Sequence, residues 1–187
     1  MNLTQQLTQY CPWNEQEEAD RRELLRRLES SEDLYTRSNA AAHLTASAWV
    51  VSPDRQQGLM AYHNLYDSWA WLGGHADGER DLLAVALREV REESGLTDVR
   101  PITEDIYSLE ILSVDGHEKH GRYVSSHLHL NVTYLLEADP AAPIRPKLDE
   151  NSRVGWFTPE RAVAASREPW YRERIYKKLN EKLAAFR

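Results

Sequence analysis

The segment between Asp81 and Gly95 constrains the fold more than any other, because it carries the start, the period and the end of one helix. Asp81 is a residue type that caps a helix N-terminus, and Gly95 is the type that ends a helix. Between them, small and apolar residues recur at helical spacing on one stripe: Leu83, Ala86, Leu87, Val90 and Ser94. The sequence therefore predicts a helix from the cap at Asp81 to Ser94 that packs this stripe against a core.

Three glutamates, Glu89, Glu92 and Glu93, share one arc beside this stripe. Like charges this close repel one another, so the arrangement favours a cation that offsets them. Carboxylate oxygens with no cysteine nearby favour Mg²⁺ or Mn²⁺ over zinc. A solvated acidic face is the ordinary alternative. However, Gly73 and Gly74 precede the helix as a predicted turn, where no side chain blocks a phosphate or a metal from the backbone.

The segments around this helix predict an α+β fold. Residues 15–29 read as a charged surface helix behind the cap residue Asn14, and residues 117–122 read as an exposed polar loop. Strand formers predict a β-hairpin over 43–51 and 59–64, a short extended piece over 69–72, and strands over 105–114, 126–138 and 153–157. A short helix after Thr158 and Pro159 and an amphipathic helix over 170–186 complete an order typical of one α+β sandwich.

The length of 187 residues suits one domain. We divide the chain into an N-terminal helical extension over 1–40 and a single domain over 41–187, which ends in the amphipathic helix (168–187). No apolar stretch approaches the roughly 18 residues of a membrane helix, and the N-terminus lacks the basic start and apolar run of a secretory signal. Cys11 is the only cysteine, which excludes an internal disulfide and a cysteine zinc cage. We expect a cytoplasmic protein with no membrane partner.

The charge balance is acidic overall but uneven. The 30 acidic and 23 basic residues give a net charge of −7, which argues against nonspecific nucleic acid binding. Residues 151–187 hold nine Lys or Arg and four Asp or Glu, a net of +5, so the rest of the chain carries −7 − 5 = −12. We expect the apolar stripe of the basic C-terminal helix to pack on the domain or on a second subunit, which leaves a homodimer open.

The segment 73–96 resembles the signature of the Nudix hydrolase family. Eight of nine fixed positions agree, and the gap of thirteen residues between Gly74 and Arg88 is kept; the matching residues are Gly74, Arg88, Glu89, Val90, Glu92, Glu93, Gly95 and Leu96. The resemblance extends over roughly residues 43–165 and implies an α/β/α sandwich with a mixed central sheet. Two positions depart from the signature: Arg80 replaces its first glutamate, with Glu79 one place early, and Leu72 replaces a common proline.

The resemblance implies metal-dependent hydrolysis of a diphosphate linkage in a nucleoside diphosphate joined to another moiety. It implies that the three helix glutamates and the carbonyl of Gly73 hold the divalent ions, and that Arg88 orients the glutamates. The general base is open among Glu89, Glu150 and Glu118.

Several other side chains are candidates for binding the substrate. His127 and His129 share one face of their predicted strand, which could line a cleft, face solvent or lie under helices. His75 directly follows the two glycines, and Arg122 belongs to the basic loop. Trp69 could stack on a base, although core packing is the more common role of such a residue.

Two other functions compete with hydrolysis. A noncatalytic module that senses a nucleotide ligand shares this fold, but such modules lose the carboxylates that this chain keeps. An enzyme similar to isopentenyl diphosphate isomerase needs a core cysteine, and no cysteine follows Cys11. The segment 73–96 determines neither which diphosphate is the substrate nor how many metal ions bind.

Overall fold

Ten strands form the sheets of this chain, which the computed structural model describes over residues 1–30, 32–119 and 121–186. They are β1 (Ala42–Val51), β2 (Gly58–His63), β3 (Ser68–Ala70), β4 (Leu72–His75), β5 (Val99–Pro101), β6 (Ser108–Val114), β7 (His117–Lys119), β8 (Arg122–Val124), β9 (His127–Ala138) and β10 (Asn151–Phe157). The main sheet follows the order β10-β2-β1-β9-β5, with β3 beside β2, β4 beside β1 and β6 beside β9. β1 and β9 are parallel and the other pairs are antiparallel, so the sheet is mixed.

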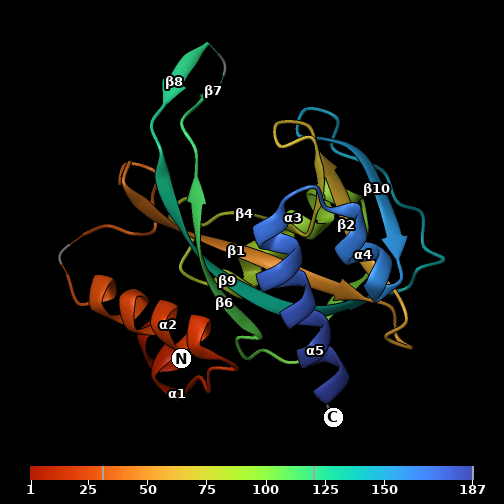
Figure 1. Ribbon diagram of the computed structural model, residues 1–187, viewed down its shortest axis with the longest axis horizontal. Coiled ribbons are helices and arrows are strands. Elements are labelled where there is room, and N and C mark those ends of the chain that lie inside the picture. Colours follow the sequence, from red (N-terminus) through yellow and green to blue (C-terminus); the bar gives the residue numbers. More distant parts are fainter. Residues whose placement is uncertain (31, 120, 187) are drawn as a thin grey trace.

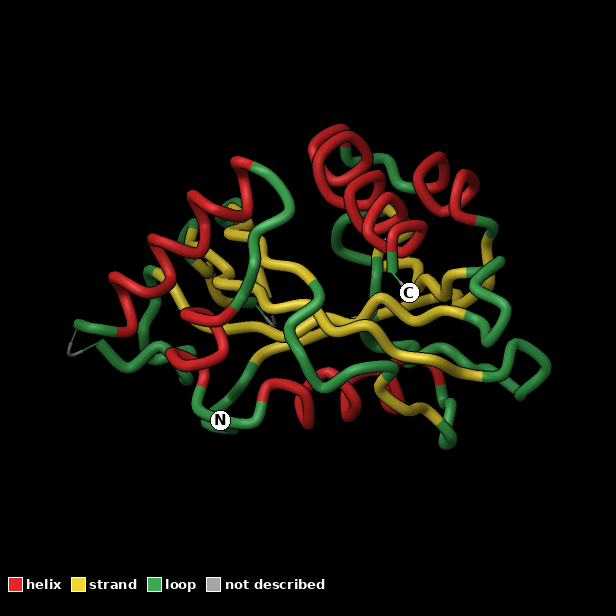
Figure 2. The backbone as a smooth tube through the Cα atoms, turned by 90° about the horizontal axis from the view of Figure 1, so that it is seen from below, coloured by secondary structure: helices red, strands yellow, loops and turns green. Residues whose placement is uncertain are grey.

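Helices cover both sides of the main sheet (Figures 1 and 2). They are α1 (Leu3–Gln9), α2 (Glu15–Leu28), α3 (Leu82–Ser94), α4 (Pro159–Ala165) and α5 (Lys177–Ala185), with a π-helical segment η1 (Tyr171–Tyr176) leading into α5. Val85 and Val90 of α3 pack in one apolar cluster with Leu44 of β1, whereas Leu179 of α5 packs in a second cluster with Trp49 of β1. The predicted α+β sandwich is confirmed.

The two faces of β1 differ because successive side chains of a strand point to opposite sides. Leu44 and Ala46 belong to the apolar cluster that contains α3. His43, Thr45 and Ser47 lie on the other face and are also buried. β9 continues this polar face, since His43 pairs with His129, Thr45 with Asn131 and Ser47 with Thr133.

Elements with strong local signals form where the sequence predicts them. The helices at 15–28 and 82–94, the long strand at 127–138, the strand at 151–157 and the helix after Thr158 all agree with the predictions. The C-terminal helix begins at Tyr171 as η1 and continues as α5, with Ile175, Leu179 and Leu183 buried as predicted.

Other local predictions were wrong because their outcome depends on distant partners. Gly73 and Gly74 form part of β4 and pair with Ser47 and Ala46 instead of making a turn. The predicted hairpin of β1 and β2 is confirmed as an antiparallel pair, but its strands pair only at Val51 and Gly58, because most of β1 pairs with β4 and β9. The expected polar loop 117–122 instead forms the hairpin of β7 and β8. His120, within this stretch, lies outside the described residues. α1 and β5 were not predicted.

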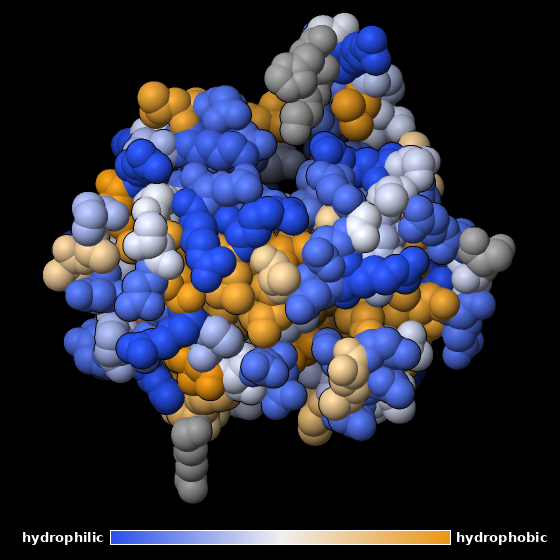
Figure 3. All heavy atoms as spheres, turned by 180° about the vertical axis from the view of Figure 1, so that it is seen from behind, coloured by the Kyte–Doolittle hydropathy of each residue, from blue (hydrophilic) through white to orange (hydrophobic). Residues whose placement is uncertain are grey.

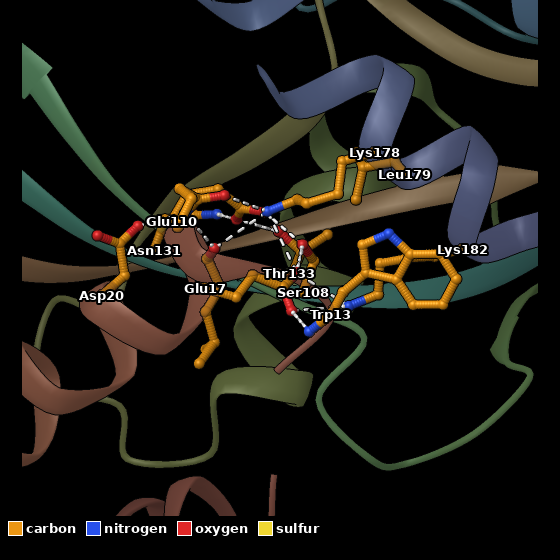
Figure 4. A network of polar contacts seen from close by, with 12 residues as sticks. Trp13, Glu17, Asp20, Ser108, Glu110, Asn131, Thr133, Lys178, Leu179 and Lys182 are labelled. Atoms are coloured by element: carbon orange, nitrogen blue, oxygen red, sulfur yellow. Dashed lines mark hydrogen bonds and ion pairs between the residues drawn. The ribbon is translucent and has the colours of Figure 1, made fainter. Parts of the chain in front are cut away.

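A buried ionic network joins the two ends of the chain (Figure 4). Lys178 of α5 lies 3.0 Å from a carboxylate oxygen of Glu110 in β6 and 3.2 Å from one of Glu17 in α2. Lys182 lies 2.9 Å from Glu17, whose side chain has no exposed surface. On the polar face of the sheet, Asn131 and Thr133 donate to the other oxygen of Glu110. This half of the face therefore lies under helices, which was one of the three alternatives for it.

Hydrophilic side chains occupy much of the surface that faces away from α5, with apolar areas between them (Figure 3). Within the described residues, every helix is too short or too polar to cross a membrane.

Candidate active site

α3 carries the predicted carboxylates and is fixed at both ends by local chemistry. The side chain of Asp81 accepts the N–H of Ala84 at 3.0 Å and caps the helix, and Gly95 ends it with a left-handed φ of 72°. The buried face is rotated from the predicted stripe: Leu82 and Val85 are buried, whereas Leu83 and Leu87 are only half-buried. This rotation turns Glu89 and Glu93 toward the glycines of β4, which leave room for their carboxylates.

Glu93 is the most buried of the three helix glutamates, with 5% of its surface exposed. One carboxylate oxygen accepts the N–H of Gly73 at 2.9 Å, and the other accepts the side-chain amide of Asn151 at 2.8 Å. Burial raises the pKa of Glu93 to about 8; the two hydrogen bonds lower it, and the negative charges of Glu89 and Glu150 raise it. A nearby cation would favour the charged form of this carboxyl group.

Glu89 lies directly over Gly74. A Cβ atom built on Gly74 would fall 2.4 Å from the carboxyl carbon of Glu89, so only glycine leaves this space open. The guanidinium of Arg88 donates to Glu89 at 2.8 Å and to the carbonyl of His75 at 3.1 Å, and thereby ties the carboxylate to β4. Burial raises the pKa of Glu89, while the hydrogen bond from Arg88 acts in the opposite direction.

Glu92 and Glu150 share one lysine as an ion-pair partner at the open side of this cluster. The ammonium of Lys147 lies 2.8 Å from a carboxylate oxygen of Glu150 and 3.5 Å from one of Glu92. The hydrogen bond to Glu150 raises the pKa of Lys147, although burial lowers it. The site therefore already holds one positive charge against its outer carboxylates.

Glu89, Glu92, Glu93 and Glu150 offer the donor type of a hard divalent cation, although among the described residues the ligand atoms found within 4.8 Å of one another belong to histidines. The carboxylates supply only oxygen donors, which Mg²⁺ and Mn²⁺ prefer. Lys147 lies where a positive charge is stabilised, and burial raises the pKa values of Glu89 and Glu93, so a cation beside them would favour their charged forms. Gly73 contacts this cluster through its N–H, as a donor to Glu93.

The predicted histidines gather around a residue that the sequence analysis missed, His43. The ring centre of His43 lies 5.1 Å from that of His75, 4.9 Å from that of His127 and 5.2 Å from that of His129. Burial lowers the pKa of His129 to about 2, and the neighbouring histidines lower it further. The structure thus brings His75, His127 and His129 together on the face of the sheet opposite α3.

The remaining predicted residues lie in other places. Trp69 in β3 packs edge-on against Phe157 with ring centres 4.7 Å apart, and the guanidinium of Arg153 lies over its ring. Glu118 and Arg122 are exposed on the hairpin of β7 and β8. A hollow of about 590 Å³ elsewhere is lined by residues of both chain ends, among them Tyr10 and Lys182, and includes none of the helix glutamates.

The first departure from the signature, Arg80 with Glu79 one place early, has local roles in the structure. The carboxylate of Glu79 accepts the backbone N–H groups of Arg80 and Asp81 at 2.7 and 2.9 Å and so supports the turn that enters α3. The guanidinium of Arg80 stacks over the ring of Tyr35, 4.7 Å from its centre. Sequence reasoning missed Lys147 and Asn151, although the acidic run at 149–150 beside them was a usable signal.

Comparisons with known proteins agree with this fold. A sequence model of the NUDIX domain matches residues 41–179. The structure is similar to an Ap4A hydrolase of C. elegans in a binary complex, with 20% identity, 76% of this chain and 98% of that chain covered, and a TM-score of 0.55. It is also similar to the dihydroneopterin triphosphate pyrophosphohydrolase of E. coli, with 14% identity, 78% and 97% covered, and a TM-score of 0.57.

A third similar structure is a hydrolase of the NUDIX family from Clostridium perfringens, with 21% identity, 78% of this chain and 98% of that chain covered, and a TM-score of 0.53. At sequence identities of 14–21%, the similarity to these structures shows a shared fold. No curated protein matches the sequence significantly.

Proposed function

Because this chain belongs to the Nudix family of hydrolases that act on pyrophosphate bonds, we propose that it cleaves a diphosphate linkage in a nucleoside diphosphate joined to another moiety. The observation that carries this proposal is the pair of carboxylates of half-buried Glu89 and buried Glu93, packed against Gly74 and Gly73. Two relatives in fold are named for reactions of this kind, an Ap4A hydrolase and a triphosphate pyrophosphohydrolase.

The helix glutamates and the carbonyl of Gly73 would hold one or more Mg²⁺ or Mn²⁺ ions. Such an ion, when bound, supplies charge neutralisation at the phosphate oxygens and lowers the pKa of an attacking water. Arg88 keeps the carboxylate of Glu89 against β4, so that the acidic group stays in one orientation. The open side of α3 leaves Glu92 accessible, with its side chain 46% exposed.

Glu150 is the general base that we favour among Glu89, Glu150 and Glu118. It shares Lys147 with Glu92 of the cluster, whereas Glu118 is on the exposed hairpin. The ammonium of Lys147 lies 2.8 Å from a carboxylate oxygen of Glu150 and keeps this side chain beside the cluster. A substrate phosphate that attracts Lys147 would free this carboxylate.

The substrate contacts remain predictions. His75, His127, His129, Trp69 and Arg122 are the candidates for binding the group attached to the diphosphate. A homodimer and a cytoplasmic location also remain predictions.

The test is turnover of a panel of nucleotide sugars, dinucleotides and nucleotides with Mg²⁺ or Mn²⁺, read by product identity. Glu92→Gln and Glu93→Gln should each lower kcat by roughly 100-fold or more, because each removes a carboxylate charge from the proposed metal site. Glu181→Gln on the exposed face of α5 is the matched control and should keep the full rate. Near-normal rates in both site variants would contradict the proposal, and tight binding without cleavage in the parent protein would identify a ligand sensor instead.

A further inference from the structure

We propose that His43, His75 and His129 form a second metal site, for a transition-metal ion such as Zn²⁺, separate from the helix carboxylates. One ring nitrogen from each of the three histidines lies within 4.8 Å of the other two. The three residues come from β1, β4 and β9, which are neighbours in the main sheet. The site would therefore join three strands that are far apart in the sequence.

The strand register explains why these rings converge. His43 of β1 is the direct partner of His129 in the parallel strand β9, and Thr45, two residues farther along β1, is the partner of His75 in β4. Residues paired in this way point to the same face of a sheet. Since Gly74 faces Glu89 of α3, the next residue, His75, points to the opposite face. The proposed site and the carboxylates thus lie on opposite sides of β4.

His43 supplies the observation that points to a ligand. Its side chain is 5% exposed, and its Nε2 atom has no hydrogen-bond partner. Its Nδ1 atom lies 3.0 Å from the carbonyl oxygen of Asn39, which can only accept, so Nδ1 carries the proton and Nε2 carries a lone pair. A histidine that donates one ring N–H to a backbone carbonyl and keeps the other nitrogen for a metal is the usual arrangement at metal sites.

His127 repeats this pattern beside the three ligands. Its Nδ1 atom lies 2.8 Å from the carbonyl oxygen of Ser125, and its Nε2 atom lies 3.2 Å from Nε2 of His129. Because Nδ1 of His127 carries the proton, its Nε2 atom accepts the Nε2–H group of His129 and leaves Nδ1 of His129 for the metal. His127 therefore orients the ring of His129, and we assign it a positioning role.

The donor set selects the class of ion. Neutral imidazoles suit zinc, copper, nickel or iron, whereas Mg²⁺ takes oxygen ligands. Three histidines around Zn²⁺ at about 2.0–2.1 Å also leave a fourth position for water or an anion. Such an ion requires the three nitrogens to approach to roughly 3.3 Å of one another, so binding would draw the rings inward from their present spacing. It would also fix β4, on which Glu89 and Glu93 rest.

Calorimetric titration of the metal-free protein with Zn²⁺, in excess Mg²⁺ to occupy the carboxylates, tests the site. We expect one Zn²⁺ per chain. His43→Gln and His129→Gln should each weaken binding by at least about 100-fold, the upper end of the loss seen when a supporting contact is removed from a metal site. The double variant Glu92→Gln/Glu93→Gln should bind Zn²⁺ like the parent protein, which separates this site from the proposed hydrolytic one. His63→Gln in β2, outside the cluster, is the matched control.

Binding of Co²⁺ gives a second measurement that needs no variant. Four-coordinate cobalt with nitrogen ligands absorbs strongly in the visible, whereas six-coordinate cobalt with oxygen ligands absorbs weakly. A strong band that Zn²⁺ abolishes supports the site even if a histidine variant fails to fold. The proposal is overturned if the parent protein shows only the weak spectrum, or if Zn²⁺ binding survives in folded histidine variants and disappears in the glutamate variants.

Discussion

At the scale of single residues, the contact of Gly74 with Glu89 determines how closely α3 can approach β4. The strand needs no unusual backbone here, because Gly74 pairs with Ala46 like any strand residue. What glycine provides is the space that the carboxylate of Glu89 fills. A side chain at this position would displace the carboxylate of Glu89, and with it the ion pair between Glu89 and Arg88.

Gly74→Ala should therefore lower kcat by about 100-fold, the effect expected when a catalytic group moves by about 1 Å. The free energy of unfolding should fall by only about 1–3 kcal/mol, since the displaced atoms are the end of a side chain. Turnover and urea unfolding measure the two effects. Gly58→Ala is the control, because its new Cβ would meet Trp49 at an ordinary 3.6 Å. Full activity in Gly74→Ala would show that Glu89 can act from another position.

At the scale of elements, α2 protects an exposed strand edge. β6 lies beside β9, and its open edge would leave backbone groups unpaired. The carboxylate of Asp20 accepts the N–H of Ile111 at 2.9 Å, and the amide of Gln16 donates to the carbonyl of Leu109 at 3.0 Å. Side chains of a helix thus take the place of a neighbouring strand.

Asp20→Ala should lower the free energy of unfolding by about 1–3 kcal/mol, because it leaves the N–H of Ile111 without its acceptor. Chemical denaturation measures this change. Arg22→Ala on the same helix is the matched control and should change stability by no more than about 0.5 kcal/mol, since its ion pair with Glu18 is exposed. Equal losses in the two variants would mean that Asp20 acts only through helix propensity.

Elements were predictable from the sequence where their signals are local. Asp81 and Gly95 mark both ends of α3, and the helical spacing of Glu89 and Glu93 is enough to place their carboxylates on one arc. Gly73 and Gly74 were assigned to a turn because local sequence does not reveal that they pair with β1. His43 was missed for the same reason: its partner His129 lies on a parallel strand 86 residues away in the sequence.

At the scale of the whole molecule, the network of Glu17, Glu110, Lys178 and Lys182 accounts for part of the basic charge of the C-terminal segment (Figure 4). Burial alone would raise the pKa of Glu17, but the two lysines outweigh it and lower this pKa to about 2 from an ordinary 4.5. A depressed carboxyl pKa contributes stability above about pH 4.5, and this contribution disappears as the pH falls toward 2.

Glu17→Gln should cost about 3–5 kcal/mol at pH 7, because it leaves two buried lysines with one carboxylate fewer. It should also flatten the fall in stability between pH 4.5 and 2, which urea unfolding at several pH values measures. Glu15→Gln on the same helix is the control: its pair with Arg174 is exposed and should contribute at most about 1 kcal/mol. An unchanged pH profile in Glu17→Gln would assign the acid sensitivity to other groups.

The same network also sets the order in which the chain can finish folding. Glu17 is synthesised before its partner Lys182, which follows 165 residues later in the chain. During synthesis α2 must therefore keep the carboxylate of Glu17 in water or in a temporary contact until α5 has been made. Closure of the two ends is a late, long-range step, and a ribosome that stalls before α5 would expose a molecule whose sheet has formed but whose ends are not yet joined.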